Sequence, residues 1–441
     1  MNPIMLVQAQ ATPQESGLRD EKWYLPLGLL SIATYLKHNG FPEISVLDAD
    51  HDSLDLIITR LQTERPSLVG INFNVFNTQL LDDVVYAAKS IDAYVVVGGQ
   101  AATPIPKRIL LSNPNIDAVV LNDGEAPMLD IARRLQSGSR DVAGIPNVSY
   151  RLPNSEVFVP NPSQIQLANL ADIPSLDRRI NGFDFDRYLR AWNRPDIDPN
   201  RVATSMYMQK GCAQHCTFCA RIDKSLRQRP ISQIYGELRT LSKEGVNYVY
   251  IVDDTIAADK RFLRGLAEIL EKNPLPMRFW AFLDARNIDE ESVGYMKTVG
   301  MEKVLVGIET GNEYLRKKNG KAYSNDFLLE RVALLGKAGI KLEDSYVLGL
   351  AGETPKTIYD TLLLSQQVAK LCQTEGTAFN KMTPLMGSPD WSRLMNAIKR
   401  EGNSTLLQHY SQGYHFSIPE VRQHYFERFC HFKPDEIKKV A

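Results

Sequence analysis

The segment Lys210-Gly211-Cys212-Ala213-Gln214-His215-Cys216-Thr217-Phe218-Cys219 holds three of the five cysteines of this 441-residue chain. Three residues separate the first two cysteines, and two residues separate the last two. Three thiolates on one short loop can bind three irons of a cubane [4Fe–4S] cluster and leave the fourth iron open to a small molecule. The spacing therefore predicts that Cys212, Cys216 and Cys219 are metal ligands.

A zinc site is the main alternative, because His215 adds a fourth possible ligand to the three cysteines. Structural zinc usually takes pairs of ligands from two separated segments, whereas these four side chains lie within eight residues. A disulfide framework does not suit an odd number of clustered cysteines. We therefore prefer the iron–sulfur cluster to zinc.

The composition is that of an ordinary globular chain with room for two domains and a tail. Hydrophobic residues make up 44% and charged residues 23%, and the net charge of −1 favours neither nucleic acid nor an anionic membrane. The first ten residues lack the pattern of a signal peptide, and no apolar stretch is long enough to span a bilayer. We expect a cytoplasmic protein, where an oxygen-labile cluster and the isolated Cys372 and Cys430 would stay reduced.

Residues 1–138 alternate short apolar runs with helical patterns. The expected strands are Ile4–Ala9, Ile44–Leu47, Leu68–Phe73, Tyr94–Val97 and Ala118–Leu121. The expected helices are Leu27–His38, Leu54–Leu61, Leu80–Ser90, Lys107–Leu111 and Ala126–Leu135. This alternation predicts a parallel sheet covered on both faces. We expect a doubly wound, Rossmann-like (flavodoxin-like) α/β domain, which binds ligands beyond the carboxyl ends of its strands.

Three of these strands end in segments that suit a ligand site. The segments are Asn74-Val75-Phe76-Asn77-Thr78, Gly98-Gly99-Gln100 and Asn122-Asp123-Gly124-Glu125. Glycine at a strand end lets a bulky ligand approach the backbone closely. No G-x-G-x-x-G pattern follows the first strand, which argues against a dinucleotide site.

A connector over residues 139–200 precedes a second strand–helix series over residues 201–385. The expected strands are Ala203–Met208, Tyr248–Val252, Arg278–Ala281, Lys303–Gly307, Leu342–Leu348 and Thr377–Met382. The expected helices are Ile231–Leu241, Phe262–Leu270, Glu290–Thr298, Phe327–Ala338 and Pro355–Lys370. In a barrel of such units the chemistry lies at the carboxyl ends of the strands. Residues 386–441 are expected to form a small helical cap.

The cysteine segment, with Phe218 before its last cysteine, resembles the signature of the radical S-adenosylmethionine (SAM) enzymes. The first domain resembles the cobalamin-binding domain of B12-dependent radical SAM enzymes. The matching segments are Pro26-Leu27-Gly28-Leu29, Val95-Val96-Val97-Gly98-Gly99 and Gly124-Glu125. The resemblance implies that residues 1–138 bind cobalamin and that residues 201–385 form a (β/α)6 partial TIM barrel.

The resemblance also implies contacts with SAM, which would bind the open iron. The implied contacts are Phe218, Asp253, Asp254, Arg286, Glu309, Gly349, Leu350 and Ala351. An acidic pair suits the amino group of SAM, and a guanidinium matches its carboxylate in a bidentate fork. Structural roles remain open for Asp253, which could form an internal ion pair, and for Glu353, which could cap the helix at Pro355.

For cobalamin, the resemblance implies a corrin ring across the strand ends, with its nucleotide tail along the glycines. The implied contacts are Asn74, Phe76, Asn77, Gly98, Gly99, Gly124 and Glu125. Gln8–Asp20 contains no histidine that could ligate cobalt, so the lower face of cobalt would meet the Asn74–Thr78 loop. A nucleotide-binding or vestigial Rossmann-like domain without a corrin is the alternative.

The activity that the resemblance implies is methylation of an unactivated carbon. One SAM would methylate cob(I)alamin, and a second would yield a 5′-deoxyadenosyl radical that takes hydrogen from the substrate. The substrate radical would then collect the methyl group from methylcobalamin. The implied partners are a small-molecule or peptide substrate and a one-electron donor such as flavodoxin or ferredoxin. The alternatives are a non-methylating cyclisation, ring contraction or rearrangement, and a corrinoid- or cluster-binding protein without turnover.

Overall fold

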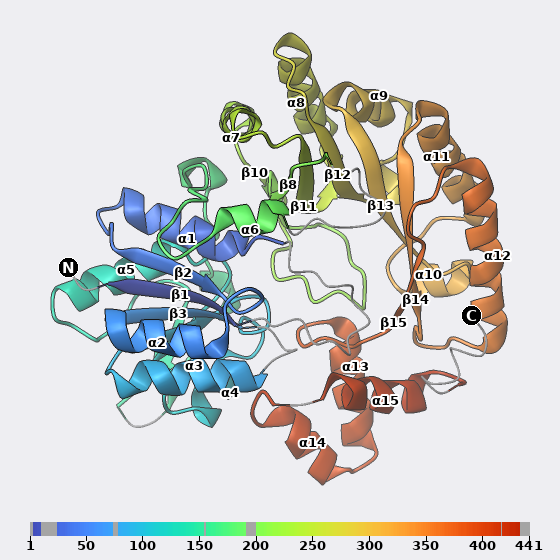
Figure 1. The fold of residues 1–441 in the computed structure, drawn as a ribbon. Helices are drawn as coiled ribbons and strands as arrows, with labels where there is room; N and C mark the ends of the chain where they lie inside the picture. Colours follow the sequence, from blue (N-terminus) through green and yellow to red (C-terminus); the bar gives the residue numbers. More distant parts are fainter. Residues whose placement is uncertain are drawn as a thin grey trace. The chain divides into compact units, whose positions relative to one another are not determined.

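The computed structural model describes residues 3–9, 24–73, 78–153, 156–190, 200–415 and 417–432. The chain divides into two compact units. One comprises residues 1–194 with 403–416, and the other comprises residues 195–402 with 417–441. Each unit is built around its own largely parallel sheet (Figure 1).

The sheet of the first unit has seven strands in the order β2-β1-β3-β4-β5-β6-β7. Its parallel strands are β1 (Ile4–Ala9), β2 (Ile44–Asp48), β3 (Leu68–Phe73), β4 (Tyr94–Gly98) and β5 (Ala118–Val120). Every residue of β1 and β2 is buried, as continuous apolar strands in a covered parallel sheet require. The order 2-1-3-4-5 is flavodoxin-like, and it confirms the predicted fold of this domain.

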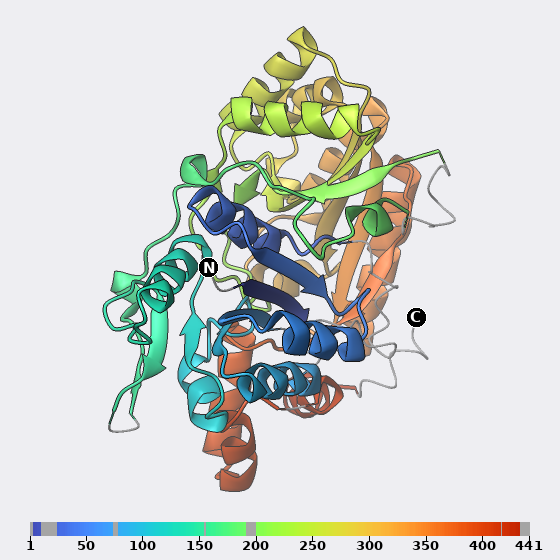
Figure 2. The same ribbon diagram turned by 60° about the vertical axis from the view of Figure 1, so that its left-hand side comes forward.

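Helices cover both faces of this sheet (Figures 1 and 2). One face carries α1 (Leu27–His38) and α5 (Glu125–Gln136), and the other carries α2 (Leu54–Glu64), α3 (Thr78–Ser90) and α4 (Pro106–Ser112). The predicted helices match these bounds to within a few residues. Because the strands run in parallel, the segments that follow them meet at one edge of the sheet.

The connector packs onto the first sheet. It contributes the antiparallel strands β6 (Val148–Arg151) and β7 (Val157–Phe158), two 3₁₀ turns, η1 (Pro162–Gln164) and η2 (Leu170–Asp172), and α6 (Phe185–Arg190). Tyr188 of α6 is buried and donates a hydrogen bond to Asp48, whose pKa burial raises to about 7. These elements were not expected, because they are too short to show a hydrophobic period.

The second unit contains six parallel strands in the order β15-β14-β13-β12-β11-β8. They are β8 (Ala203–Met206), β11 (Tyr248–Ile256), β12 (Arg278–Leu283), β13 (Met301–Glu309), β14 (Lys341–Leu348) and β15 (Ala378–Lys381). The strands follow one another across the sheet in chain order, which is the topology of a barrel that stays open. The predicted (β/α)6 partial barrel is confirmed.

Helices line the outer face of this open barrel (Figure 1). They are α7 (Ile231–Lys243), α8 (Lys260–Lys272), α9 (Glu290–Val299), α11 (Asn325–Ala338) and α12 (Pro355–Leu371). Four of them begin at a side chain that caps a backbone N–H of the first turn; the caps are Asp259, Asp289, Ser324 and Thr354. A short helix, α10 (Glu313–Lys318), follows β13 and was not predicted.

The tail is helical, as expected, but it divides between the two units. The helices α13 (Pro389–Arg400) and α15 (Ile418–Phe429) belong to the second unit, whereas α14 (Ser404–Ser411) belongs to the first. No helix among the described residues is both long and apolar enough to cross a membrane.

A polar cluster after α14 ties the tail to α3. Tyr414 is buried, its ring stands edge-on to Phe73 at 5.6 Å, and its hydroxyl donates to Asp82. Asn113 Nδ2 donates to Asp82 Oδ1 at 2.9 Å and to the Tyr414 hydroxyl at 3.0 Å. His415 Nε2 lies 2.8 Å from Asp82 Oδ2. Asp82 therefore joins three side chains from two distant segments.

We predict that Asp82→Ala loosens α3 and its contact with the tail. The variant leaves the buried Tyr414 hydroxyl without its acceptor, which costs about 1–3 kcal/mol. Hydrogen exchange of the α3 amides should accelerate accordingly. Asp83→Ala is the matched control, because Asp83 accepts only an exposed hydrogen bond from Gln79 and should change stability by less than about 0.5 kcal/mol. Equal exchange in the two variants would contradict a special role for Asp82.

Candidate functional site

The three cysteines lie in a loop that a two-stranded hairpin closes. The chain leaves β8, forms β9 (Gln209–Lys210), and returns as β10 (Arg227–Gln228), which pairs with β9. Gly211 opens the loop with φ +91°, and a Cβ there would lie 1.8 Å from the carbonyl oxygen of Ser225. Only glycine fits such a position. The loop is therefore pinched shut at its base.

Two acidic residues of β11 hold this base. Asp253 Oδ1 accepts the backbone N–H of Met208 at 2.7 Å, and Asp254 Oδ2 accepts that of Gly211 at 3.1 Å. Asp253 is buried, and burial raises its pKa to about 7. The internal interactions are hydrogen bonds to backbone amides rather than the ion pair considered for Asp253. Its buried Oδ2 has no hydrogen-bond partner among the described residues, and the role of Asp253 toward SAM stays a prediction.

A second segment, Asn319-Gly320, lies along the middle of the cysteine loop. The backbone N–H of Thr217 donates to Asn319 O at 3.3 Å, and the Thr217 hydroxyl lies 2.7 Å from Asn319 Oδ1. Gly320 has φ +91°, and a Cβ there would lie 2.4 Å from His215 O and 3.0 Å from the backbone nitrogen of Cys216. The two backbones are thus packed directly against each other.

A third contact comes from the start of α13. Asp390 is fully buried and accepts from the Thr217 hydroxyl at 2.9 Å and from the Tyr425 hydroxyl at 3.0 Å. Its own backbone N–H donates to Thr217 O at 3.0 Å. Thr217 stands between two of the cysteines, so these bonds fix the part of the loop that carries them.

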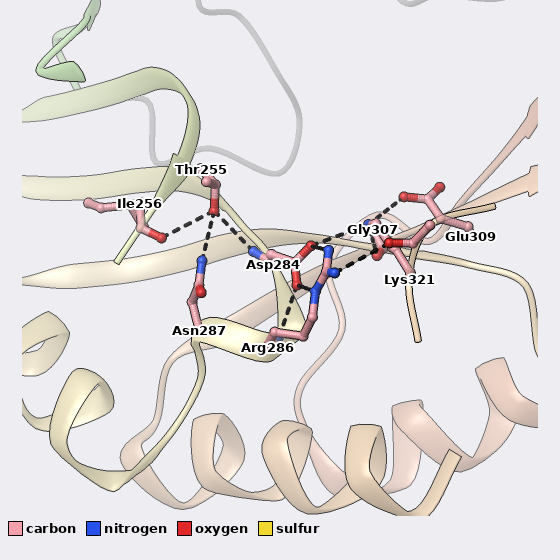
Figure 3. A network of polar contacts seen from close by, with 9 residues as sticks. Thr255, Ile256, Asp284, Arg286, Asn287, Gly307, Glu309 and Lys321 are labelled. Carbon is pink, nitrogen blue, oxygen red and sulfur yellow. Dashed lines mark hydrogen bonds and ion pairs between the residues drawn. The ribbon is translucent and has the colours of Figure 1, made fainter. Parts of the chain in front are cut away.

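A charged network lies at the carboxyl ends of β12 and β13 (Figure 3). Arg286, in the 3₁₀ turn η3 (Ala285–Asn287), forms a bidentate pair with Asp284, with Nε–Oδ1 and Nη2–Oδ2 both at 2.8 Å. The Nη1 of Arg286 donates to Gly320 O at 3.3 Å. The backbone N–H of Asp284 donates to Thr255 Oγ1 at 3.3 Å, which links the network to β11. The fork expected to bind the SAM carboxylate is thus occupied by Asp284 within the chain.

Glu309 has a partner within the chain as well. It ends β13 at a shift in strand register, with a positive φ of +68°, and its Oε1 lies 2.7 Å from Lys321 Nζ. Lys321 also donates to Gly307 O at 2.6 Å and lies 3.9 Å from Asp284 Oδ2. Burial is the largest single influence on the pKa of Lys321 and lowers it, but Glu309 together with Tyr323, Asp284 and Cys216 outweighs burial, so the pKa is raised. The roles of Arg286 and Glu309 toward SAM stay predictions.

The loop after β14 is braced by α15. Gly349 has φ +101°, and a Cβ there would lie 2.0 Å from Phe426 Cζ. Leu350 and Ala351 are buried. The carboxylate of Glu353 accepts the backbone N–H of Gly349, and burial raises the Glu353 pKa to about 7. The capping role considered for Glu353 is wrong, because Thr354 caps α12 instead.

The thiols themselves suit a cubane cluster. Cys212 and Cys216 are half-buried and Cys219 is exposed. Burial raises the pKa of the Cys216 thiol to about 11, so iron must displace its proton. No three His, Cys, Asp or Glu side chains of the described ranges are placed to hold a single metal ion, whereas a cubane takes one thiolate per iron. His215 Nδ1 lies 3.1 Å from Arg221 Nη2, and Phe218 is half-buried in the same loop.

The glycines at the strand ends of the first unit differ in whether a side chain could replace their hydrogen. A Cβ on Gly98 would meet only Val120, at 3.5 Å and beyond, whereas one on Gly99 would lie 1.9 Å from Asn72 Oδ1. A Cβ on Gly124 would lie 2.6 Å from Ile32 Cδ1. Among the described residues, Gly98 is therefore a strand-end glycine that packing does not require. Its contact with cobalamin stays a prediction.

Of the predicted cobalamin contacts that are not glycines, the structure describes Glu125. Glu125 is buried at the start of α5 and accepts from Ser31 Oγ at 2.6 Å. Asn74, Phe76 and Asn77 lie outside the described residues. Their proposed position below cobalt stays a prediction.

Several residues that shape the site carry no signal in the sequence. They are Thr217, Asp284, Asn319, Lys321 and Asp390. Thr217 is part of the cysteine segment, but nothing marks it as an anchor. The other four are recognisable only from the side chains and backbone that they contact.

Known proteins match both halves of the chain. Residues 22–132 match the B12 binding domain, and residues 206–364 match the radical SAM superfamily. An uncharacterized methyltransferase of Pyrococcus horikoshii is 25% identical over 374 residues, covering 83% of this chain and 77% of that protein. Cytidylyl-2-hydroxyethylphosphonate methyltransferase of Streptomyces wedmorensis is 27% identical, in an alignment that covers 82% of this chain and 76% of that protein. The anaerobic magnesium-protoporphyrin IX monomethyl ester cyclase of Rubrivivax gelatinosus is 23% identical, in an alignment that covers 77% of this chain and 62% of that protein.

Among solved structures, the radical SAM methyltransferase TsrM of Kitasatospora setae, with cobalamin and a [4Fe–4S] cluster bound, has a TM-score of 0.73. It is 20% identical and covers 90% of this chain and 75% of that one. Another structure of TsrM, 21% identical with a TM-score of 0.72, holds a tryptophan substrate and a SAM analogue and covers 90% and 76%. The likeness confirms the fold, and the two matched domains confirm the predicted cofactors: a [4Fe–4S] cluster, SAM and cobalamin.

We predict that side chains at Gly98 weaken cobalamin binding in proportion to their size. Gly98→Ala should reduce the affinity for hydroxocobalamin slightly and Gly98→Val strongly, while both variants keep the wild-type stability, because Val120 is met only at ordinary contact distances. Equilibrium titration followed by absorbance, together with thermal unfolding of the cofactor-free protein, measures both effects.

Gly99→Ala provides the contrast. It should destabilise the cofactor-free protein, because its Cβ overlaps Asn72. Unchanged hydroxocobalamin affinity in Gly98→Val would place the nucleotide tail elsewhere.

Proposed function

Since this chain joins a B12-binding domain to a radical SAM domain and is a cobalamin-dependent radical SAM enzyme, we propose that it is a C-methyltransferase. It would move a methyl group from methylcobalamin to an unactivated carbon of its substrate. The observation that carries this proposal is that two methyltransferases align with more than four-fifths of the chain, across both domains. Both are named for methyl transfer, and a side chain at Gly98 would meet none of the described residues closer than 3.5 Å, which is compatible with a corrinoid there.

The proposal assigns distinct tasks to the residues of the site. When bound, the cluster with SAM supplies the 5′-deoxyadenosyl radical, and cobalamin supplies the methyl group. Cys212, Cys216 and Cys219 hold the cluster. The bonds to Asp254 and Asp390 keep their loop in one conformation, so that the reacting groups are positioned before substrate binds.

A non-methylating ring closure is the second candidate. It is favoured by the magnesium-protoporphyrin cyclase, which aligns with 77% of this chain. A ring contraction or rearrangement belongs to the same class of outcome, with cobalamin relaying electrons. A corrinoid- or cluster-binding protein without turnover is the remaining possibility, and it differs from both in forming no product from SAM.

The products of SAM separate these functions without knowledge of the substrate. We expect the anaerobically reconstituted protein, given SAM, hydroxocobalamin and a low-potential reductant, to form S-adenosylhomocysteine and 5′-deoxyadenosine. Cys216→Ala should abolish 5′-deoxyadenosine and retain S-adenosylhomocysteine, because the cluster and the corrinoid occupy different units. Liquid chromatography with mass spectrometry quantifies both. 5′-Deoxyadenosine without S-adenosylhomocysteine would favour ring closure, and neither product would favour a binding protein.

The substrate and setting follow from the same proposal. A small-molecule substrate is supported by TsrM, which was solved with tryptophan, although a peptide would present a carbon equally well. A reducing cytoplasm suits the cluster and the isolated Cys372 and Cys430.

An acidic one-electron carrier, such as flavodoxin or ferredoxin, is the proposed donor. Residues 210–228 carry four basic side chains, Lys210, Arg221, Lys224 and Arg227, against one acidic side chain, Asp223. Cys219 and Lys224 are both exposed on this segment, whereas Arg227 pairs with Asp223 at 2.6 Å, so Lys224 is the exposed cation of the segment that carries the thiols. Complementary charge of this kind accelerates encounter between partners.

We predict that Lys224→Glu slows cluster reduction by flavodoxin several-fold at low ionic strength, with the difference fading at high salt. Reduction by dithionite, a small molecule, should stay unchanged. Lys243→Glu is the control, because it changes the same charge at the exposed end of α7. Stopped-flow absorbance follows the rates. Equal slowing by both variants would mean that net charge, rather than this surface, governs the reaction.

A further inference from the structure

A buried lysine in the charged network of Figure 3 belongs to none of the expected cofactor contacts. Lys321 is 7% exposed and follows the unpredicted helix α10. A fully charged ammonium is costly to bury unless it is paired. Its position therefore calls for a reason beyond packing.

The chain before Lys321 places it beside the cluster ligands. Gly320 packs on the backbone of Cys216, and Asn319 bonds to Thr217. Lys321 is the next residue along this segment.

The charges around Lys321 fall into two pairs. Arg286 and Asp284 neutralise each other through their bidentate contact. Lys321 and Glu309 form the second pair, at 2.7 Å, and both side chains are buried. Lys321 directly follows Gly320, whose Cα lies against the backbone of Cys216, so the positive member of the second pair belongs to the segment that packs on the ligand loop.

Charged side chains near an iron–sulfur cluster change its reduction potential without touching it. Reduction adds one electron to the cluster, so a nearby positive charge stabilises the reduced form and a nearby negative charge destabilises it. Burial strengthens both effects, because little water screens them. The potential of an iron–sulfur cluster is known to depend on the net charge and hydrogen bonding around it.

We propose that Lys321 is a positioning residue that raises the reduction potential of the cluster on Cys212, Cys216 and Cys219, with Glu309 opposing it. This inference rests on the cluster and not on methyl transfer. It gives Glu309 a role that does not require contact with SAM. It also accounts for the strained backbone of Glu309, which directs the carboxylate at Lys321.

A purely structural role is the competing explanation. Lys321 Nζ donates to Gly307 O at 2.6 Å and could serve only to hold the irregular end of β13. In that case removing Lys321 or Glu309 would disturb the site in the same way. An electrostatic role instead requires opposite effects from the two residues, and the two explanations therefore differ in sign.

The experiment is a double-mutant cycle that removes each of the two charges singly and together, and it measures the midpoint potential of the cluster by redox titration. The midpoint potential of the reconstituted cluster is followed by electron paramagnetic resonance in wild type, Lys321→Met, Glu309→Gln and the double variant. We expect Lys321→Met to lower the ratio of reduced to oxidised cluster roughly tenfold at a fixed solution potential, which corresponds to ~59 mV for one electron. Glu309→Gln should raise this ratio, and the double variant should return close to wild type.

Two further variants control the cycle. Lys321→Arg keeps the charge and should stay near the wild-type potential. Lys317→Met removes an exposed lysine from α10 and should change nothing. If Lys321→Met fails to retain four irons, Glu309→Gln and Lys321→Arg still decide the sign.

Shifts of Lys321→Met and Glu309→Gln in the same direction, or no shift in either, would overturn the proposal. A wild-type protein that takes up no cluster would overturn the cofactor assignment and this inference with it. A cluster that shifts as described in a protein that transfers no methyl group would leave the inference standing and sink the proposed function alone.

Discussion

The structure depends on holding an irregular loop of ten residues in one conformation. A loop without a ladder of its own must satisfy its backbone amides elsewhere. Here Asp253 and Asp254 serve the base of the cysteine loop, Asn319 serves its middle, and Asp390 fixes Thr217 from another side. Buried carboxylates are costly unless they are hydrogen-bonded. Asp253 and Asp390 are buried, and their hydrogen bonds to Met208 and Thr217 offset the cost of burying them, whereas Asp254 is exposed.

In both units the parallel strands bring distant segments to one edge of the sheet. The glycines at those edges, however, have different structural roles. Gly99 and Gly349 have positive φ and would collide with Asn72 and Phe426, so the protein's own packing requires them. Gly98 meets no such obstacle. Glycine at a strand end is therefore not by itself a mark of a ligand. Only the contacts of each position separate a glycine needed for packing from one that leaves room.

The acidic and basic residues expected at SAM are already paired within the chain. Arg286 binds Asp284, and Glu309 binds Lys321. These pairs do not conflict with ligand binding, since a carboxylate offers about four acceptor sites and the guanidinium has five donors. They do show that these charged side chains are already held in fixed positions by ion pairs within the chain. Such preorganisation lets charge act on the reacting groups without reorganisation.

The sequence alone predicted the parallel strands of both sheets and the long helices that cover them, because buried parallel strands are continuous apolar runs and their helices repeat the helical period. The short elements β6, β7, α6 and α10 show no such pattern and were found only in the structure. The sequence also predicts Cys212, Cys216 and Cys219 as the cluster ligands, because their spacing is local. The contacts of Asn319 and Asp390 with Thr217 were decided by tertiary structure, since they join residues 102 and 173 positions apart. The division of the tail between the two units was likewise decided by tertiary structure, because Tyr414 bonds to Asp82, which lies 332 residues earlier in the chain. No local pattern records such contacts, because they exist only once the parallel sheets have brought the segments together.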